Sequence, residues 1–397
     1  MTDFTETRKQ FHLPKDSIYL DGNSLGPLPI AASQRVATTL QNEWGEMVVG
    51  GWNRAGWMNQ PSVLGDRIAR LIGAPKGTVI VGDTLSLRVY QALAAALGSQ
   101  SERTIVLSDS GNFPTDLYMA EGLLRSLDKG HELKIAAPEE VEAAIDEDVA
   151  VLMLTEADYR TGRLHDMKKL TAKAHAAGAV VVWDLAHSAG AIPIDLVDAN
   201  ADFAVGCTYK YLNGGPGAPA FIYVREDLLD DVQPALSGWL GHEKPFDFDL
   251  EYRPGDGIER MRVGTPPVIQ MAALEAALDV WDDVDMNDVR EKSIHLSTLF
   301  LEGVEAACPQ LKLASPRDPH QRGSQVSFRF EHGYSVIQAL IARGVTGDFR
   351  APDIMRFGFT PLYLSDDDVL GAVEHLVDIM KSGSWDQPLF HARSAVT

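Results

Sequence analysis

Two stretches within residues 184–210 decide the fold of this chain: Asp184-Leu185-Ala186-His187 and Ala201-Asp202-Phe203-Ala204-Val205-Gly206-Cys207-Thr208-Tyr209-Lys210. An aspartate directly follows the apolar run 180–183, and a lysine follows the apolar run 203–207. Open α/β sheets place their binding sites at the ends of strands. We therefore expect both side chains to emerge at one edge of a sheet.

An aspartate and a lysine in this arrangement suit pyridoxal phosphate. The lysine can bind the aldehyde of the cofactor as a Schiff base, and the carboxylate can keep the pyridine nitrogen protonated so that the ring accepts electrons. The same pair also fits a buried ion pair or two solvated strand ends. Residues elsewhere in the chain must decide between these interpretations.

The composition is that of an ordinary soluble protein and disfavours several classes of function. The 397 residues are enough for roughly two or three domains. Acidic residues number 56 and basic residues 35, and the formal net charge of −21 disfavours a nucleic-acid partner. Cys207 and Cys308 stand far apart without metal-ligand spacing, so we expect no metal site and a reducing, cytoplasmic location. No apolar run approaches the ~20 residues that span a bilayer, which predicts no membrane segment.

Strand and helix patterns alternate along the first two thirds of the chain. Apolar runs predict strands at residues 79–82, 104–107, 149–154, 179–183, 203–207 and 220–224. This order predicts an α/β protein with a mainly parallel sheet in its large lobe, followed by a smaller α+β C-terminal lobe. A stretch rich in Gly, Pro and Arg at 255–267 suggests the boundary. We therefore expect an N-terminal arm at 1–30, a large cofactor-binding domain at 31–267 and a small domain at 268–397.

Two loops that follow predicted strands are candidates for cofactor contacts. Asp83 and Thr84 precede a helix whose free N–H groups and positive dipole end suit a phosphate, although either residue is also a plausible N-cap. Phe113 carries a ring that can stack on a planar cofactor. Pro114 and Asp116 beside it also fit an ordinary helix start without any function.

Six motifs spread over most of the chain point to one family of proteins. They are Tyr19-Leu20-Asp21-Gly22-Asn23-Ser24-Leu25-Gly26, Phe113-Pro114-Thr115-Asp116, Tyr159-Arg160-Thr161-Gly162, Asp184-Leu185-Ala186-His187, Tyr209-Lys210-Tyr211-Leu212-Asn213 and Met355-Arg356-Phe357-Gly358-Phe359-Thr360-Pro361-Leu362-Tyr363. Together they resemble the kynureninase family, which belongs to the aspartate-aminotransferase-like (fold type I) class of pyridoxal-phosphate enzymes.

The resemblance implies a role for each matching residue. Lys210 would bind the cofactor covalently, Asp184 would pair with the pyridine nitrogen, and the cofactor ring would lie among Phe113, Asp116 and His187. Residues implied at the phosphate end are Asp83, Thr84, Tyr209, Trp239 and Thr265, with Thr155 as a further contact. Arg356 would bind the substrate carboxylate through its guanidinium fork, unless it is only a structural arginine between strand and loop.

The implied reaction is the hydrolysis of L-kynurenine to anthranilate and L-alanine, a step of tryptophan catabolism. Lys210 would take the α-proton, and Tyr209 is the candidate that protonates the β-carbon. Trp52, Gly264 and Thr265 would lie near the aromatic ring of the substrate. Because an indole offers mainly an apolar face and a single donor, we expect 3-hydroxy-L-kynurenine to be the lesser substrate. The family also implies a homodimer, with residues 239–265 reaching across to the second subunit.

Other functions remain open at this stage. An aminotransferase would share the lysine, aspartate and arginine roles. A cysteine desulfurase would need a mobile nucleophilic cysteine, whereas Cys207 lies in an apolar strand and Cys308 follows a helix, which favours inert thiols. A non-catalytic scaffold that only binds the cofactor would not need Lys210, Asp184 and Arg356 together.

Overall fold

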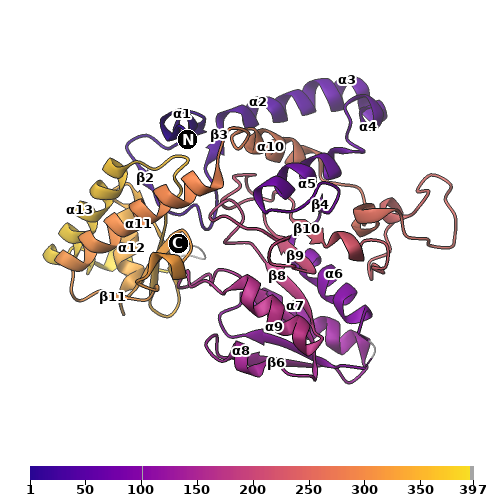
Figure 1. Ribbon diagram of the computed structural model, residues 1–397. Coiled ribbons are helices and arrows are strands. Elements are labelled where there is room, and N and C mark those ends of the chain that lie inside the picture. The colour runs from indigo at the N-terminus through magenta and orange to yellow at the C-terminus, as the bar shows by residue number, and fades with distance from the viewer. Residues whose placement is uncertain (101, 394–397) are drawn as a thin grey trace.

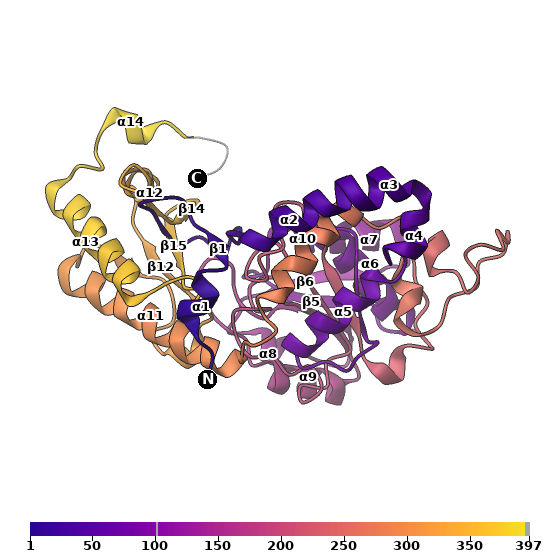
Figure 2. The ribbon, with the colours of Figure 1, turned by 90° about the horizontal axis from the view of Figure 1, so that it is seen from above.

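A computed structural model describes residues 1–100 and 102–393 of the chain. Figure 1 and Figure 2 show two lobes side by side, with the residues after 285 forming most of the smaller lobe in orange and yellow. The α/β architecture and the two-lobed arrangement that the sequence predicts are confirmed.

The larger lobe is built around a sheet of seven strands. In spatial order they are β4 (Val79–Val81), β10 (Phe221–Val224), β9 (Phe203–Gly206), β8 (Val180–Asp184), β7 (Val149–Thr155), β5 (Ile105–Asp109) and β6 (Glu132–Ala136). The pairs β9–β8, β8–β7, β7–β5 and β5–β6 are parallel, and β10 is antiparallel to both of its neighbours. Every strand that the sequence predicts is present, with bounds that differ by at most a few residues.

Helices cover both faces of this sheet, which explains why its central strands are apolar throughout. Successive side chains of a strand point to opposite faces. Val181 and Trp183 pack in the core shared with α5 (Gln60–Leu71), α9 (Met167–Ala177) and α10 (Val268–Asp279), and Val182 packs on the other side with α6 (Leu85–Gly98) and α7 (Pro114–Leu127). The short helix α8 (Val141–Ala144) lies near β5.

Helix α9 shows how the local sequence sets these boundaries. The carboxylate of Asp166 caps the N-terminus by accepting a hydrogen bond from the Lys169 N–H at 3.0 Å. Gly178 ends the helix with φ +82°, a conformation that glycine adopts without steric cost. The chain then enters β8 directly, so the turn fixes where Asp184 stands.

The smaller lobe carries a four-stranded antiparallel sheet in the order β11 (Lys312–Leu313), β12 (Gln325–Arg329), β15 (Ile354–Gly358), β14 (Asp348–Arg350). Its helices are α11 (Met286–Ala307), α12 (Gly333–Ile341), α13 (Asp366–Ser382) and α14 (Pro388–His391). Within the described residues, no helix is long and apolar enough to cross a membrane.

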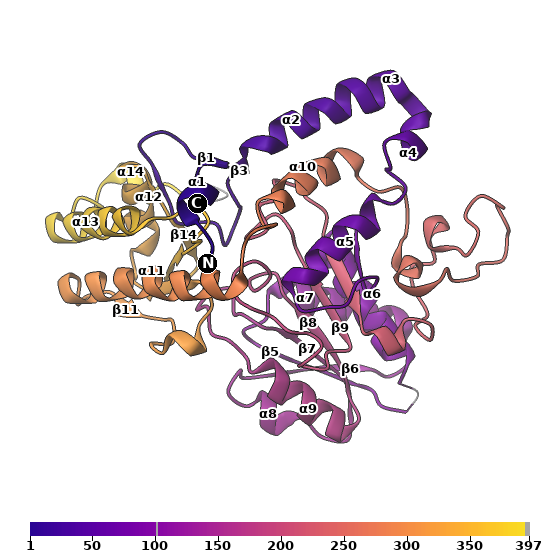
Figure 3. The ribbon, with the colours of Figure 1, turned by 45° about the horizontal axis from the view of Figure 1, so that its top comes forward.

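The N-terminal segment crosses between the lobes. Helix α1 (Phe4–Arg8) and strand β2 (Ile18–Tyr19) lie on the smaller lobe, where β2 pairs in parallel with β13 (Val345–Thr346). After β1 (Phe11–His12) and β3 (Leu28–Pro29), the chain continues through α2 (Ile30–Thr38), the π-helical turn Thr39–Trp44, α3 (Gly45–Met47) and α4 (Gly51–Arg54). Figure 3 shows this helical segment extending along the outside of the larger lobe.

The packing of helix α10 indicates where the boundary between the two domains lies. It packs against α2 and α5, which belong to the larger lobe. The predicted boundary at residue 267 precedes this helix. We propose that the small domain begins instead at α11, after the turn at 280–285.

Candidate active site

A cavity of about 130 Å³ lies where the two lobes and the N-terminal segment meet. Its base is formed by the carboxyl ends of three parallel strands: Thr155 is the last residue of β7, Asp184 is the last residue of β8, and Lys210 follows β9. The other lining residues are Asn23, Ser24, Leu85, Phe113, Tyr159, Ala186, His187, Tyr209, Arg350 and Arg356. The fold therefore brings the aspartate and the lysine of the opening motif to one edge of the sheet.

Two buried carboxyl groups interact at the site, that of Asp184 at the base of the cavity and that of Asp116 next to it. Burial, the charge of Asp184 and a hydrogen bond to Asp184 raise the pKa of Asp116 well above its usual range. Asp184 accepts hydrogen bonds from the Ala186 N–H at 2.8 Å and from the Thr155 hydroxyl at 3.3 Å, and Lys210 adds a favourable positive charge. Burial nevertheless raises the pKa of Asp184. We assign the proton to Asp116, which leaves the negative charge on Asp184.

The amine of Lys210 lies against a neutral imidazole. Its Nζ is 3.0 Å from Nε2 of His187. Burial, followed by the positive charges of Lys210, Arg356 and Arg350, lowers the pKa of His187 well below its usual range. His187 therefore accepts at Nε2 and carries its hydrogen on Nδ1, a buried atom without a hydrogen-bond partner among the described residues.

Aromatic side chains form one wall of the cavity. Phe113 is 41% exposed and packs edge-on against the ring of Tyr159, with ring centroids 5.1 Å apart. One face of the Phe113 ring therefore remains available for stacking. The phenol of Tyr209 stands next to Lys210, and burial together with the Cys207 thiol raises its pKa above the ordinary value.

The N-terminus of α6 opens toward the same cavity. Thr84 occupies the N-cap position but makes no capping hydrogen bond, so the N–H groups of the first turn keep their capacity to bind an anion. Asp83 has φ +56°, and its carboxylate lies 3.8 Å from the guanidinium of the buried Arg88. The acidic side chain is thus paired with a cation near the start of the helix.

These features fit pyridoxal phosphate. Phe113 offers a face on which the planar ring can stack, and Asp184 offers an anion near the ring nitrogen. Lys210 offers an amine for the aldehyde, and the first turn of α6 offers N–H groups for the phosphate. Buried polar atoms without partners among the described residues also lie at or beside the cavity, as expected of a site built for a ligand: His187 Nδ1, Asp116 Oδ2, both amide atoms of Asn23 and Nε of Arg350.

Besides Asp83, Thr84 and Asp116, which neighbour lining residues, four of the residues singled out in the sequence do not line this cavity. Trp52 lies in α4, where its ring packs on Trp57 with centroids 5.7 Å apart. Trp239 lines a separate hollow with Phe248, and Gly264 and Thr265 are exposed. Their roles in binding the cofactor and the substrate stay predictions that depend on a second subunit.

The structure also adds residues that the sequence did not single out. Asn23, Ser24 and Tyr159 stand within motifs already quoted, so the motifs contained their signal. Arg350 lies outside every motif. The only hint of its position is the alternation of Asp348 and Arg350, which places both side chains on one face of a strand.

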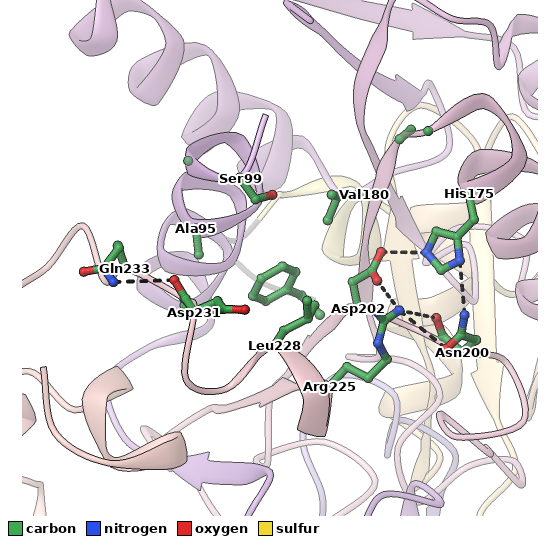
Figure 4. Close-up of a pocket in the computed structure, with 15 residues that line it drawn as sticks. Ala95, Ser99, His175, Val180, Asn200, Asp202, Arg225, Leu228, Asp231 and Gln233 are labelled. Atoms are coloured by element: carbon green, nitrogen blue, oxygen red, sulfur yellow. Dashed lines mark hydrogen bonds and ion pairs between the residues drawn. The ribbon is translucent and has the colours of Figure 1, made fainter. Parts of the chain in front are cut away.

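A larger cavity, of about 390 Å³, lies at the opposite ends of β8 and β9 and is lined by Val180 and Phe203 (Figure 4). Its polar wall is a cluster in which the residues satisfy one another. Asp202 accepts from Nε2 of His175 at 2.8 Å and from Arg225, and Asn200 contacts the other imidazole nitrogen at 3.3 Å. None of the residues singled out in the sequence lines this cavity.

The fold and the site define a fold type I enzyme that depends on pyridoxal phosphate. The fold is shared with a cysteine desulfurase from Thermococcus onnurineus NA1, with a TM-score of 0.81, 19% identity, and coverage of 96% of this chain and 99% of that one. A cysteine desulfurase from Escherichia coli gives a TM-score of 0.80 at 20% identity, covering 96% and 99%. At this level of identity the likeness concerns the fold alone.

Sequence comparison identifies the family. A family model described as the kynureninase C-terminal domain matches residues 289–376. Kynureninases from Pseudomonas fluorescens and from Burkholderia pseudomallei (strain 1106a) are each 50% identical to the chain, over 98% of its length and 95% of theirs. The chain belongs to the kynureninase family, whose members are hydrolases of carbon–carbon bonds, and this confirms the resemblance seen in the motifs.

Proposed function

We propose that this protein hydrolyses L-kynurenine to anthranilate and L-alanine, with 3-hydroxy-L-kynurenine as a lesser substrate. One observation carries the proposal: in a chain of the kynureninase family, a single cavity is lined by Lys210, Asp184 and Arg356, with Asp116 next to Asp184. Both cysteines are buried, and burial raises the pKa of each thiol, which disfavours the mobile nucleophile of a desulfurase. An aminotransferase would give a keto acid and no anthranilate.

Bound pyridoxal phosphate supplies an electron-accepting ring next to the α-carbon of the substrate. Asp184 provides the negative charge that keeps the ring nitrogen protonated, and Asp116 confines that charge to one carboxylate. The Lys210 amine removes the α-proton, and the neutral His187 3.0 Å away can hold or pass on a proton at Nε2.

Hydrolysis then requires water at the side-chain ketone and a proton at the β-carbon. Water adds to the ketone, the bond between the carbonyl carbon and the β-carbon breaks, the β-carbon takes up a proton, and the α-carbon regains the proton that Lys210 removed, which gives anthranilate and L-alanine. We assign the proton to Tyr209, because a phenol with a raised pKa stays protonated at neutral pH and lies beside Lys210 in the cavity wall. Arg356, in the wall formed by the smaller lobe, binds the carboxylate.

The test is a direct assay of the purified holoenzyme with L-kynurenine, in which release of anthranilate and L-alanine in equal amounts is the expected result. Lys210→Ala should abolish release, because no other amine among the described residues lines the cavity. Lys168→Ala, which removes an exposed lysine paired with Asp198 on the surface, should behave as the wild type. Formation of a keto acid without anthranilate would refute the proposed reaction.

We also propose that the protein is a homodimer. Large apolar side chains are exposed on two projecting segments: Trp44, Val48 and Val49 after α2, and Phe246, Phe248 and Leu250 in the loop after Trp239. All three views show this loop extending away from the body of the larger lobe. Exposed apolar patches mark interaction sites, and isologous dimers are the commonest oligomers.

The free cysteines and the net charge of the chain suggest where the protein is located and what kind of partner it binds. We propose a cytoplasmic protein, because its two cysteines are free and do not pair with each other. The formal net charge of −21 favours a small organic substrate over nucleic acid as the partner.

A further inference from the structure

We infer that Arg350 is a second arginine of the site that binds the α-carboxylate of the substrate, beside Arg356. The inference rests on the proposed function, since it concerns the same amino-acid substrate. It follows from the hydrogen bonds and charges around one aspartate of the smaller lobe.

Asp348 is shared by two guanidinium groups. Strand β14 pairs antiparallel with β15, so that Asp348 lies opposite Arg356 and Arg350 lies opposite Ile354. The Asp348 carboxylate accepts from Nε of Arg356 at 2.6 Å and also from its Nη2, and the Nη2 atom of Arg350 is 2.8 Å from the same carboxylate. A single negative charge therefore faces two positive charges.

Most of the donors of Arg356 are already occupied. Its Nε and Nη2 each donate one hydrogen bond to Asp348. Nη2 donates a second hydrogen bond to the Ser24 hydroxyl at 3.0 Å, and Nη1 donates to the carbonyl of Tyr159. A guanidinium group has five N–H bonds, so Arg356 keeps only one for a ligand. Without rearrangement, it cannot offer the pair of parallel N–H groups that a carboxylate binds best.

Arg350 has the donors that Arg356 lacks. Its Nη2 contacts Asp348 and lies 3.5 Å from the Ser24 hydroxyl, whereas its Nε is buried and has no partner within residues 1–100 and 102–393. Its side chain lines the cavity that contains Lys210. A buried N–H without a partner is costly, and a carboxylate in the cavity would satisfy it.

The charged groups around Arg350 leave a net positive charge that one substrate carboxylate would neutralise. Apart from Arg356 and Asp348, the ionisable groups that act on Arg350 are Asp21 and the phenol of Tyr159. Burial, followed by the charge of Asp348, raises the pKa of Asp21 to about 7, so Asp21 is largely neutral in slightly acidic solution. Two arginines and one ionised aspartate then leave one positive charge. The charge of Arg350 also reaches the catalytic groups, because it helps to lower the pKa of His187 and acts on that of Tyr209.

The experiment compares two ligands that differ only in the carboxylate. L-Alanine and ethylamine are titrated separately into the holoenzyme, and binding is followed by visible absorption. Arg350→Gln should weaken L-alanine binding by roughly ten- to a hundredfold and leave ethylamine binding unchanged. The control Arg329→Gln removes an arginine of the same lobe that pairs with Asp353 at the surface, and it should change neither affinity.

Two results would overturn the inference. Unchanged L-alanine binding in Arg350→Gln would show that Arg350 does not bind the carboxylate, and an equal loss for both ligands would show a purely structural role. Arg350→Gln should fold, because Asp348 keeps its hydrogen bonds to Arg356. If it does not fold, Arg350→Lys decides by the same comparison, with a smaller selective loss expected since the charge is retained. A wild type that releases no anthranilate from L-kynurenine would refute the proposed function while leaving this comparison intact.

Discussion

Besides Asp184, three acids shielded from solvent have raised pKa values, and the surroundings of each acid give its proton a different role. Asp116 is protonated chiefly because it is buried beside the charge of Asp184, so its proton belongs to the cofactor site. Asp21 is buried beside Asp348, which places its titration in the carboxylate site. Burial raises the pKa of Glu156 to about 7. The titration of Glu156 should therefore change the free energy of unfolding of the protein with pH.

We predict that Glu156→Gln stabilises the protein at alkaline pH. The folded state holds a proton on Glu156 up to a pKa of about 7, whereas the unfolded chain releases it near 4.5. The stability that this group contributes is complete below the unfolded value and is lost as pH rises through the folded value. Relative to the wild type, the free energy of unfolding of the variant should rise by up to roughly 3 kcal/mol between about pH 4.5 and pH 8.

Urea unfolding of the wild type and the variant at several pH values measures this difference. Glu147→Gln is the matched control, because Glu147 is exposed in the loop before β7. A stability difference between wild type and Glu156→Gln that does not change with pH would contradict the assignment of a buried, titrating carboxyl group.

At the scale of single residues, the sequence revealed the groups whose position follows from the chain alone. Asp184 and Lys210 follow apolar strands, and parallel strands bring their ends to one edge. Arg350 could not be found in this way. Its role emerges only from the hydrogen bonds around Asp348, which join distant parts of the chain. The Asp348 carboxylate accepts from the hydroxyl of Ser24 at 2.9 Å, although the two residues are 324 positions apart in the sequence.

At the scale of elements, the start of α6 resolves a difficulty that the sequence raised. An aspartate at the entrance of a phosphate-binding helix would repel the anion. The fully buried Arg88 pairs with Asp83 at 3.8 Å and donates to the carbonyls of Gly82 and Met261. The same arginine therefore offsets the acidic charge and fixes the loop that precedes the helix.

Helix α13 offers a quantitative test of a capping motif. Ser365 accepts from the Asp368 N–H at 3.2 Å, and Asp368 accepts from the Ser365 N–H at 2.7 Å. We predict that Ser365→Ala weakens the helix start by about 1 kcal/mol. Amide hydrogen exchange in the first turn of α13 should then be roughly fivefold faster, as followed by mass spectrometry.

Ser382→Ala is the control for this prediction. Ser382 lies at the other end of α13, where its hydroxyl donates to the Asp378 carbonyl at 2.7 Å and accepts from the Ser384 N–H at 3.4 Å, so it makes no contact with the first turn of the helix. The start of the helix should exchange as in the wild type. Equal acceleration in both variants would show that the serine hydroxyls act on the helix as a whole and not through the cap.

Elements were predictable where the sequence pattern is local, whereas the boundary between the lobes depends on packing between distant segments. The strands β4, β5, β7, β8, β9 and β10 follow from apolar runs. The Gly- and Pro-rich stretch 255–267 looks like a linker, yet the chain returns through α10 to pack on α2 and α5. Packing between segments more than 200 residues apart leaves no signal in local composition.

At the scale of the whole molecule, the cavity is completed by parts of the chain that are far apart. Lys210 and Asp184 belong to the larger lobe, Ser24 to the N-terminal segment, and Arg350 and Arg356 to the smaller lobe. The arm is held to the smaller lobe by an ion pair between Arg8 and Asp368 and by the Thr7 hydroxyl, which donates to the Leu362 carbonyl at 2.8 Å. The proposed binding of the substrate carboxylate would therefore couple the arm and the smaller lobe to Lys210.

The predicted homodimer can be tested through its projecting loop. Sedimentation of the wild type should give twice the chain mass of 43.3 kDa. Phe248→Asp should shift the protein toward monomer and weaken cofactor binding, because a charge then replaces an exposed ring at the predicted interface. Phe248 has φ +51°, a conformation that aspartate tolerates well, so the substitution should not strain the loop.

Leu389→Asp is the control, since Leu389 is similarly exposed but lies in α14 of the smaller lobe. It should leave the mass and the cofactor content unchanged. A monomeric wild type with full activity would refute the dimer, and with it the predicted phosphate contacts of Trp239 and Thr265.

The preference between substrates depends on the same assembly. Trp52 and Thr265 lie outside the cavity of their own chain, so we expect them to reach the aromatic ring of a substrate bound in the other subunit. An indole leaves a buried ring hydroxyl without a good partner, which costs on the order of 1 to 3 kcal/mol. The ratio of kcat/KM for L-kynurenine to that for 3-hydroxy-L-kynurenine should therefore exceed unity by roughly ten- to a hundredfold. Trp52→His should lower this ratio, because an imidazole can bond the hydroxyl, and Trp385→His, at a tryptophan of the smaller lobe that stacks on His332, should not. A wild-type ratio at or below unity would refute this role of Trp52 without affecting the chemistry assigned to Lys210.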